Sequence, residues 1–496
     1  MSKPDKYLVF LSFVGFAIVY AIVASGAIFH HYIPAYGPAV YDQYFLALWN
    51  GKVDVPPQVI RYEGHYAPDG TAYVYHGLAP LLTRAALAPF IQIGSVSLAA
   101  FSIWFWAVLG TGLYHLMIAR WLSRQVDAET PSTLAVQIIF SLGIWLGGPG
   151  ILLVSNTALY HEPIAVAYAM VAGFLWCALW PRGEGTYALL WRLFMMACFA
   201  AVTVHARPSV AVGLYAILCF LSLYHLRLDW RRALLPAAVV MVVLLVSGLA
   251  YIGFNAYRMG SGLTMHGSFE AGSIQYGSTF LGLEPVDSVR ARSFEENGRF
   301  ALARILPNLM VYLIDFQFSI ITLFITTLHF HLVNAVSGYV RIEGPSIGLV
   351  FLWPVWMFLA WQARAHFQRH WSASNIILGG LLLVTVLTLS YATITLRYRF
   401  DIWPLIIAIA LLGLRKSQAR APDKPIPPAQ VTLYGILTAI GVFVSVATAV
   451  SYSHNFRYNV FSMEWTDHQC REIMGEIGFD ASEHDHLCRR PEHYTF

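Results

Sequence analysis

The residues of this chain best suited to chemistry are carboxylates and arginines that border long apolar segments. Asp42 follows the first such segment, in the sequence YDQY at 41–44, and His161 and Glu162 lie in the turn before another. An ionisable group beside a membrane is unfavourable unless it is paired or hydrated, so each is a functional candidate. Two simpler interpretations stay open: Asp42 caps the helix expected at 45–49, and a short external turn is polar in any case.

Arginines stand at further positions where membrane topology does not require them. Arg207 precedes one apolar segment, and Arg397 and Arg399 flank Tyr398 before another. Lys and Arg concentrate in cytoplasmic loops, whereas these positions fall on the opposite side of the predicted membrane. Two arginines around a tyrosine suit a phosphate or pyrophosphate, which guanidinium groups bind through paired hydrogen bonds. A pair between Arg399 and Asp401, anchored among lipid headgroups, is the alternative.

Together these groups suit the transfer of a sugar from a lipid phosphate. An external carboxylate accepts the proton of an attacking hydroxyl, and arginines neutralise a departing phosphate. The sequence has no Walker A loop, dinucleotide fingerprint, Gly-x-Ser-x-Gly elbow or His-Glu-x-x-His motif. We therefore expect neither ATP nor NAD. No cofactor is predicted with certainty, and a divalent metal stays open without a residue pattern that supports it.

Composition and hydropathy place these groups on a membrane protein. Of the 496 residues, 57% are hydrophobic and 12% are charged, against about 25% charged in soluble domains. This excludes a water-soluble enzyme, and the net charge of +4 indicates no nucleic-acid partner because basic loops set topology. A helix needs roughly 20 apolar residues to cross the bilayer. We predict an all-α polytopic bundle of about eleven spans: 7–29, 96–119, 132–154, 163–181, 187–204, 208–226, 233–255, 346–363, 375–393, 402–414 and 430–451.

The basic residues indicate the orientation of the bundle. With Lys3 and Lys6 in the cytoplasm, every later basic cluster stays on that side only if the apolar run 309–333 does not cross. That run is broken by Asp315 and His329, and we predict an amphipathic or re-entrant segment at the outer surface. The N-terminus then lies inside and the tail 452–496 outside. Span 7–29 indicates a signal anchor rather than a cleaved signal peptide, because its apolar core is long.

Chemistry is expected in the two long external loops, 30–95 and 256–345, with amphipathic juxtamembrane helices in both. The Pro-rich stretch 415–429 is a predicted cytoplasmic linker between a catalytic domain at 1–414 and the last span. Cys470 and Cys488 lie in the predicted external tail. There we predict a disulfide rather than a metal site with His484 and His486.

Several stretches resemble the bacterial GT-C glycosyltransferases. They are YDQYFLALWNG at 41–51, DGTAYVYHGLAPLL at 69–82, HARPS at 205–209, FNAYRMGS at 254–261 and RYRFDIWPL at 397–405. The order of features is also similar: one N-terminal helix, a long first external loop that opens with an acidic residue, and an acidic turn after the third span. The likeness extends along most of 1–414.

This resemblance implies a polyprenyl-phosphate sugar donor, transfer with inversion, and a carboxylate base in the first external loop. Asp42 matches that base and Glu162 the acidic position of the second loop, and the single acids leave metal dependence open. Arg207, Arg397 and Arg399, with Tyr398, would contact the donor phosphate. The residues assigned to the sugar or acceptor, or else only to folding of the loop, are Arg61, Glu63, His65, Tyr73, His76 and His161.

Three functions of different classes remain. The first is a glycosyltransferase of the bacterial inner membrane that modifies an envelope glycan, lipid or protein at a site facing the periplasm or exterior. The second is a transporter or flippase for a lipid-linked saccharide, and the third is a non-catalytic scaffold for envelope assembly. Transporters carry ionisable residues near the middle of their spans. Here such residues lie at the outer ends, which favours the enzyme.

Overall fold

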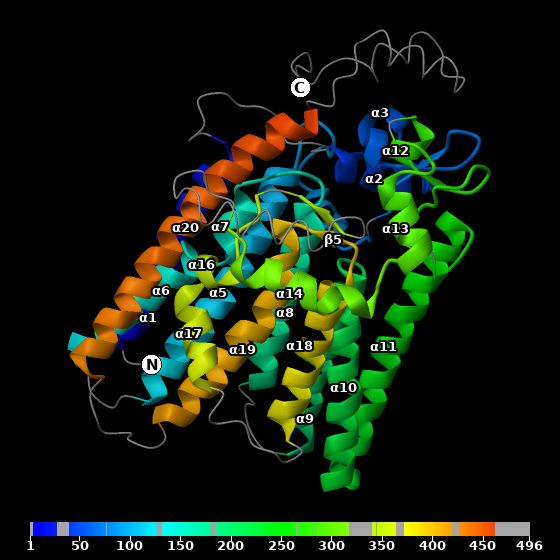
Figure 1. Cartoon of the computed structure of the whole chain (residues 1–496). Helices are drawn as coiled ribbons and strands as arrows, with labels where there is room; N and C mark the ends of the chain where they lie inside the picture. The colour runs from blue at the N-terminus through cyan, green and yellow to red at the C-terminus, as the bar shows by residue number, and fades with distance from the viewer. Residues whose placement is uncertain are drawn as a thin grey trace.

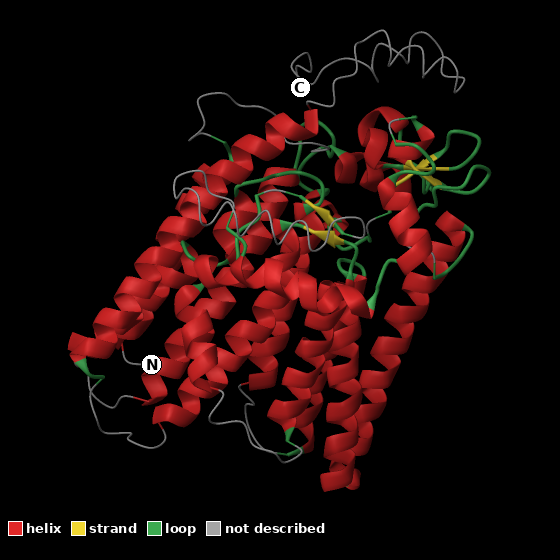
Figure 2. Cartoon of the chain, viewed as in Figure 1, coloured by secondary structure: helices red, strands yellow, loops and turns green. Residues whose placement is uncertain are grey.

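Helices dominate the fold, which is described by a computed structural model (Figures 1 and 2). The described residues are 3–26, 39–75, 77–125, 131–179, 185–263, 266–282, 284–316, 340–343, 345–363, 372–418 and 426–461. The bundle contains α1 (Lys3–Ala24), α5 (Ala99–Gln125), α6 (Pro131–Trp145), α7 (Pro149–Val154), α8 (His161–Leu179), α9 (Thr186–Val204), α10 (Pro208–Leu228), α11 (Trp230–Met259), α16 (Leu349–Leu352), α17 (Pro354–Ala363), α18 (Ala373–Ser390), α19 (Arg399–Gln418) and α20 (Pro428–Phe461).

Shorter elements form the segments between these helices. The first of the two predicted external loops contains α2 (Val40–Trp49), α3 (Pro57–Ile60), η1 (Arg61–Glu63), β1 (His65–Tyr66), β2 (Ala72–Tyr73) and α4 (Leu81–Leu87). The second contains β3 (Gln275–Tyr276), α12 (Gly277–Phe280), α13 (Val289–Asn297), η2 (Leu302–Arg304), α14 (Ile305–Ile314) and β4 (Arg341–Ile342). Between α18 and α19 lie β5 (Thr393–Ile394) and η4 (Leu396–Tyr398).

Nine helical segments of the described chain are long and apolar enough to cross a membrane. They are Lys6–Ala24, Ala99–Ser123, Ser132–Val154, His161–Leu179, Thr186–Val204, Pro208–Leu228, Trp230–Met259, Ala373–Ser390 and Pro428–Ser453. Each corresponds to a predicted span. Of the other two predicted spans, 346–363 contains α16 and α17, and 402–414 lies within α19. The helical polytopic fold is therefore confirmed, while the number of eleven crossings and their orientation stay predictions.

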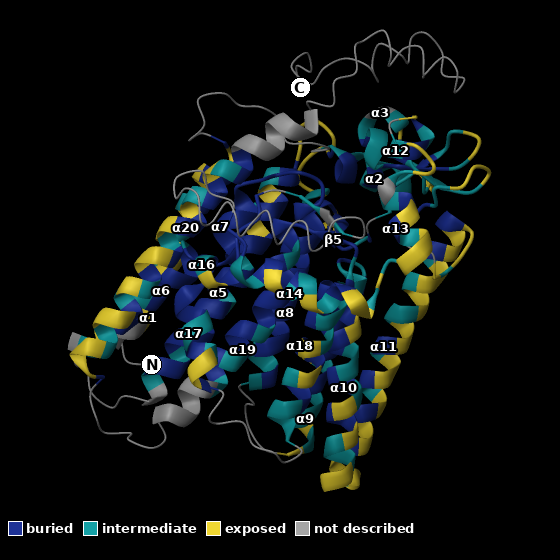
Figure 3. Ribbon diagram, viewed as in Figure 1, coloured by how far each residue is buried: buried dark blue, intermediate teal, exposed yellow. Residues whose placement is uncertain are grey.

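The outward surface of the long helices is exposed and apolar (Figure 3). On α11, Val242, Leu245 and Leu249 are 60, 56 and 65% exposed, which suits contact with lipid rather than water. Inside the bundle, α10 and α18 approach closely at Gly213 and Gly380. A Cβ atom on Gly213 would lie 2.4 Å from the Gly380 carbonyl oxygen, so a larger residue would push the helices apart. Close packing at small residues is typical of membrane helices.

The run 309–333 lies only partly within the described residues. Its start belongs to α14, which crosses the upper end of α18 in Figure 1. α14 buries Asn308 and Val311 on one face and leaves Leu306 and Met310 on the other 69 and 42% exposed. The exposed side chains of this part are apolar, so the amphipathic or re-entrant character of 309–333 stays a prediction. Residues 317–339 lie outside the described chain.

The predicted linker and tail are also described only in part. α19 runs to Gln418 and α20 begins at Pro428, so helix extends into both ends of the predicted linker 415–429. Cys470 and Cys488 lie outside the described residues, and their disulfide stays a prediction. The division of the chain into domains stays a prediction as well.

The two external loops meet in one small sheet above the bundle (Figures 1 and 2). β1 pairs antiparallel with β2, His65 opposite Tyr73, and also with β3, His65 opposite Tyr276. A second sheet joins β4 to β5 in parallel, Arg341 opposite Thr393. Segments far apart in the sequence are thereby held together over the end of the bundle at which α8 and α10 begin.

Candidate functional site

A cavity of about 670 Å³ lies where the two loops cover the helix ends. This volume falls within the range of about 300–1,000 Å³ typical of small-molecule sites. Five residues predicted from the sequence line it: Glu63, His65, Arg207, Arg397 and Tyr398. The cavity therefore brings residues of the first external loop together with Arg207 and Arg397, two of the arginines that depart from the positive-inside rule.

Arg207 and Arg397 lie against the same aromatic ring. The Cζ atoms of Arg207 and Arg397 are 5.0 and 5.6 Å from the centroid of Tyr398. Arg207 forms an ion pair with Asp401, and Nη2 of Arg397 lies 2.9 Å from Oε2 of Glu343. Burial opposes the charge of Arg397, but Glu343 and the surrounding tyrosines together outweigh it and raise the pKa of Arg397 well above its usual range. Both guanidinium groups are therefore fixed in place and charged.

The backbone around Arg207 is fastened to the first external loop. Arg207 is the N-cap residue of α10, and Pro208 takes the first helical position, which suits its fixed φ angle. The amide of Ala79 donates a hydrogen bond of 2.9 Å to the carbonyl of His205. A Cβ atom on Gly77 would lie 1.9 Å from that same carbonyl oxygen, so only glycine allows this approach. The loop thus closes directly over the arginine.

Arg399 has a different environment from its two neighbours. It is fully buried, its Cζ lies 4.9 Å from the ring of Tyr312, and Nη2 lies 3.3 Å from the Ser346 hydroxyl. It does not line the cavity. The alternative pair of Arg399 with Asp401 is not formed, because the Asp401 carboxylate accepts from Arg207 instead. The structure therefore joins Arg397 with Arg207 rather than with Arg399.

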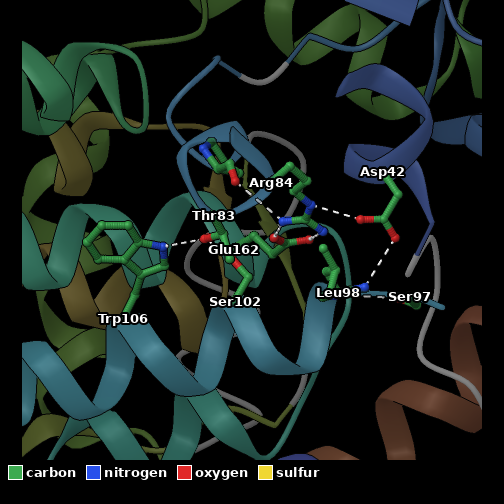
Figure 4. Close-up of polar contacts among 10 residues, drawn as sticks. Asp42, Thr83, Arg84, Ser97, Leu98, Ser102, Trp106 and Glu162 are labelled. Carbon is green, nitrogen blue, oxygen red and sulfur yellow. Dashed lines mark hydrogen bonds and ion pairs between the residues drawn. The ribbon is translucent and has the colours of Figure 1, made fainter. Parts of the chain in front are cut away.

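Asp42 and Glu162 meet at a single arginine outside the cavity (Figure 4). Arg84 donates from Nε to Asp42 at 2.8 Å, from Nη2 to Glu162 Oε1 at 3.1 Å, and from Nη1 to Glu162 Oε2. The other Asp42 oxygen accepts from the amide of Leu98 at 3.2 Å. Exposure is 1% for Asp42 and 0% for Arg84 and Glu162. This buried cluster ties α2, α4 and α8 together.

The structure corrects one interpretation of Asp42. The N-cap of α2 is Ala39, so the interpretation of Asp42 as a helix cap is wrong. Burial raises the pKa of the Asp42 carboxyl despite the opposing charge of Arg84. Sequence reasoning missed Arg84, although an arginine within the apolar external stretch PLLTRAAL departs from the topological bias just as Arg207 does.

Of the remaining predicted residues, those that the structure describes do not line the cavity. Arg61 has a φ of +49° and its carbonyl accepts from the Tyr66 hydroxyl at 2.8 Å. Tyr73 pairs within the sheet, and the fully buried His161 packs 5.4 Å from the ring of Tyr452. His76 lies outside the described residues. Their predicted contacts with sugar or acceptor stay untested.

The cavity also contains residues that sequence reasoning did not single out. Most of them come from the second external loop, whose length was the signal that predicted chemistry there. They are Tyr75, Tyr160, His266, Tyr276, Glu284, Arg290 and Glu343. Within the described chain, no group of three or more His, Cys, Asp or Glu side chains is arranged to hold a metal ion.

No protein-family model matches the sequence, and no curated protein matches it. Solved structures do show a likeness. The Archaeoglobus fulgidus oligosaccharyltransferase in its apo form is 14% identical, with a TM-score of 0.47 over 91% of this chain and 57% of that chain. ArnT from Cupriavidus metallidurans, bound to undecaprenyl phosphate, is 12% identical, with a TM-score of 0.45 over 94% of this chain and 77% of that chain.

A third likeness is to the archaeal oligosaccharyltransferase AglB from Archaeoglobus fulgidus, in complex with an inhibitory peptide and a dolichol-phosphate. It is 13% identical, with a TM-score of 0.44 over 91% of this chain and 56% of that chain. The chain thus spans little more than half the length of the oligosaccharyltransferases.

Proposed function

We propose that this chain is a membrane-embedded glycosyltransferase that takes a sugar from a polyprenyl-phosphate donor. The observation that carries the proposal is the placement of Arg207 and Arg397 on Tyr398, within a cavity at one end of an apolar bundle. A guanidinium group has five N–H donors. Asp401 engages Nη2 of Arg207, so donors remain for a phosphate oxygen. A lipid phosphate suits a site that lies directly beside the lipid-facing helices.

The proposed reaction is a single displacement at the anomeric carbon. An acceptor hydroxyl attacks that carbon while a carboxylate takes its proton, and the bond from the sugar to the phosphate oxygen breaks. The polyprenyl phosphate leaves with the electron pair, and Arg207 and Arg397 stabilise its added negative charge. Attack from the side opposite the leaving group inverts the anomeric configuration. No nucleotide takes part.

Glu63 is the proposed base. It is the cavity-lining carboxylate of the first external loop, where the sequence resemblance puts this role. Its charge contributes to the raised pKa of Tyr75 and of Tyr160, after the larger effect of burial. The Cζ of Arg397 lies 4.5 Å from the ring of Tyr160. Glu63 is therefore near the phosphate arginines, whereas Asp42 is enclosed with Arg84.

We assign Asp42 and Glu162 a positioning role. Through Arg84 they hold α2 and α4 against the start of α8, next to Tyr160 in the cavity wall.

We also propose that the cavity faces the periplasm or exterior of a bacterial inner membrane. Arg207 precedes α10 and Arg227 lies in its last turn. At a rise of 1.5 Å per residue these ends are about 30 Å apart, the thickness of the hydrocarbon layer.

Donor binding tests the site directly. Native mass spectrometry of the protein in nanodiscs measures the affinity for undecaprenyl phosphate. Because a hydrogen bond to a charged group contributes about 1.5–3 kcal/mol, Arg207→Gln and Arg397→Gln should each weaken binding about 10- to 100-fold. Arg231→Gln, at the opposite end of the bundle, is the matched control. Equal binding by all the variants would contradict the proposed phosphate site.

Transfer is tested separately from binding. Mass spectrometry of the envelope glycans, with and without the protein, should reveal a sugar that depends on the chain. The same spectra identify the acceptor, whether it is a glycan, a lipid or a protein. Translocation of a lipid-linked sugar in reconstituted liposomes, with no transferred product in cells or in vitro, would identify a flippase and overturn the enzyme.

A further inference from the structure

Four aromatic side chains from the two loops form an aromatic wall in the cavity. His65 stacks on Tyr75 with ring centroids 4.6 Å apart, and it meets Tyr276 edge-on at 5.2 Å. The ring of His266 lies 5.0 Å from Tyr75 and 5.9 Å from His65. All four side chains line the cavity. The β1–β3 pairing sets His65 opposite Tyr276, so the sheet holds the wall in shape.

A rigid ion pair borders this aromatic wall. Nε of Arg290 lies 2.9 Å from Oε1 of Glu284, and Nη2 contacts Oε2. The hydroxyls of Ser288 and Ser278 donate to the same two oxygens at 2.8 and 2.9 Å. The Cζ of Arg290 lies 4.8 Å from the ring of Tyr276. Glu284 thus cancels the charge of Arg290 and fixes its guanidinium beside the wall.

The imidazole of His266 is uncharged at neutral pH. Burial lowers the pKa of His266 to about 3, and the positive charges of Arg299 and Arg290 add to this effect. A neutral imidazole both donates and accepts a hydrogen bond. The wall therefore presents aromatic faces, neutral polar atoms and a guanidinium that is paired with a carboxylate.

These features match the surface of a neutral sugar ring. A pyranose has an apolar C–H face, which packs on aromatic rings, and hydroxyls at its edge, which exchange hydrogen bonds with imidazole, carboxylate and guanidinium groups. An acyl chain has no hydroxyl with which to donate or accept a hydrogen bond at these polar groups. A phosphate or an acidic sugar would find the guanidinium of Arg290 already neutralised, in contrast to a site built for an anion.

The aromatic wall is adjacent to the proposed donor site. The ring of Tyr391 lies 5.7 Å from that of Tyr398, and the charge of Arg207 helps to lower the pKa of the wall residue His266, after the larger effect of burial. Tyr391 and Tyr276 both line the same cavity. A ring held on the wall would therefore lie next to a sugar held at Arg207 and Arg397.

We infer that the wall formed by His65, Tyr75, His266, Tyr276 and the Arg290–Glu284 pair binds a neutral pyranose ring of a glycan or glycolipid. That this ring is the acceptor of the reaction rests on the proposed function. Binding of the ring to the wall does not depend on that function. The inference selects a saccharide among the acceptors that the sequence left open.

Saturation-transfer NMR on the protein in nanodiscs tests the wall with defined probes. The probes are methyl β-D-glucopyranoside, methyl N-acetyl-β-D-glucosaminide and methyl β-D-glucuronide at millimolar concentration. A neutral glycoside should receive saturation at its ring C–H protons. Loss of one stacked ring in Tyr276→Ala should weaken binding about fivefold, and Tyr276→Phe should retain most of it. Tyr257→Ala is the matched control, because Tyr257 is 73% exposed and lies outside the cavity lining.

The outcomes separate this inference from the proposed function. Arg207→Gln should lose undecaprenyl phosphate and keep the glycoside, while Tyr276→Ala should do the reverse. Absence of glycoside saturation in a wild-type protein that binds undecaprenyl phosphate would overturn the wall assignment alone. Undiminished glycoside binding by Tyr276→Ala would overturn it too, and so would a preference for the glucuronide. Failure of the wild type to bind undecaprenyl phosphate would count against the donor site alone.

Discussion

Arg84 of α4 forms an ion pair with Glu162 at the start of α8, and neither side chain is exposed. Asp42 binds the remaining edge of the same guanidinium, so one cation serves two buried carboxylates. A buried charge is tolerated only when it is paired and hydrogen-bonded. These ion pairs therefore hold the first external loop on the bundle. Each of the three side chains needs its charged partner to stay buried.

Removal of Arg84 should strongly destabilise the protein. Arg84→Met leaves two buried carboxylates without their cation, and loss of one partner from a buried pair typically lowers the unfolding free energy by about 3–5 kcal/mol. Arg232→Met is the matched control, since Arg232 and its partner Asp229 are 68 and 45% exposed and such pairs contribute about 0–1 kcal/mol. Unfolding by SDS titration, followed by tryptophan fluorescence, measures both. Equal stability of the two variants would show that the cluster is not a structural tie.

Metal chelation should leave the activity unchanged. Arg84 occupies the space between Asp42 and Glu162, where it supplies the positive charge that a carboxylate pair needs. A divalent cation would have to displace a fully buried guanidinium to bind there. The measurement is formation of the glycan product before and after EDTA treatment. A loss of product that Mg²⁺ or Mn²⁺ restores would disprove this prediction.

The helices could be predicted from the sequence because each signal is local. An apolar run of about 20 residues specifies a span wherever it occurs, and Arg207 and Arg397 stood out by the positive-inside rule alone. The partners of these arginines could not be predicted in the same way. Arg207 pairs with Asp401, 194 positions along the chain, and this contact exists only once α10 and α19 have packed.

The aromatic wall escaped prediction for a related physical reason. His266, Tyr276 and Arg290 sit in a loop with no hydropathy period, and strand pairing with the first loop gives them a common surface. Asp42, in contrast, was predicted as a site residue because its type and sequence position suited a base. The fold encloses its carboxylate with Arg84, a contact that sequence spacing does not reveal.

Glu63 and Asp42 should respond differently to loss of charge. Glu63→Gln removes the proposed base from the cavity and should reduce product formation about 10²- to 10⁴-fold, the usual contribution of general base catalysis. Its unfolding transition and its affinity for undecaprenyl phosphate should match the wild type. Asp42→Asn should instead lower stability, because it disrupts the Arg84 cluster. If Asp42→Asn abolishes transfer with unchanged stability while Glu63→Gln stays active, Asp42 is the base, as the sequence resemblance implied.

The stability of the protein should fall as the pH drops below 6.5, in part because of His266. In the unfolded chain this imidazole titrates near its ordinary pKa of 6.5, whereas the pKa of His266 in the folded protein is about 3. Between these values the unfolded state binds more protons, so acidification favours unfolding, and above pH 6.5 the contribution vanishes. His266→Gln keeps a neutral polar side chain and should flatten the pH dependence over this window. Thermal unfolding of both proteins across the range measures the difference. Parallel pH profiles would show that His266 is readily protonated in the folded protein, and the wall would then carry a positive charge.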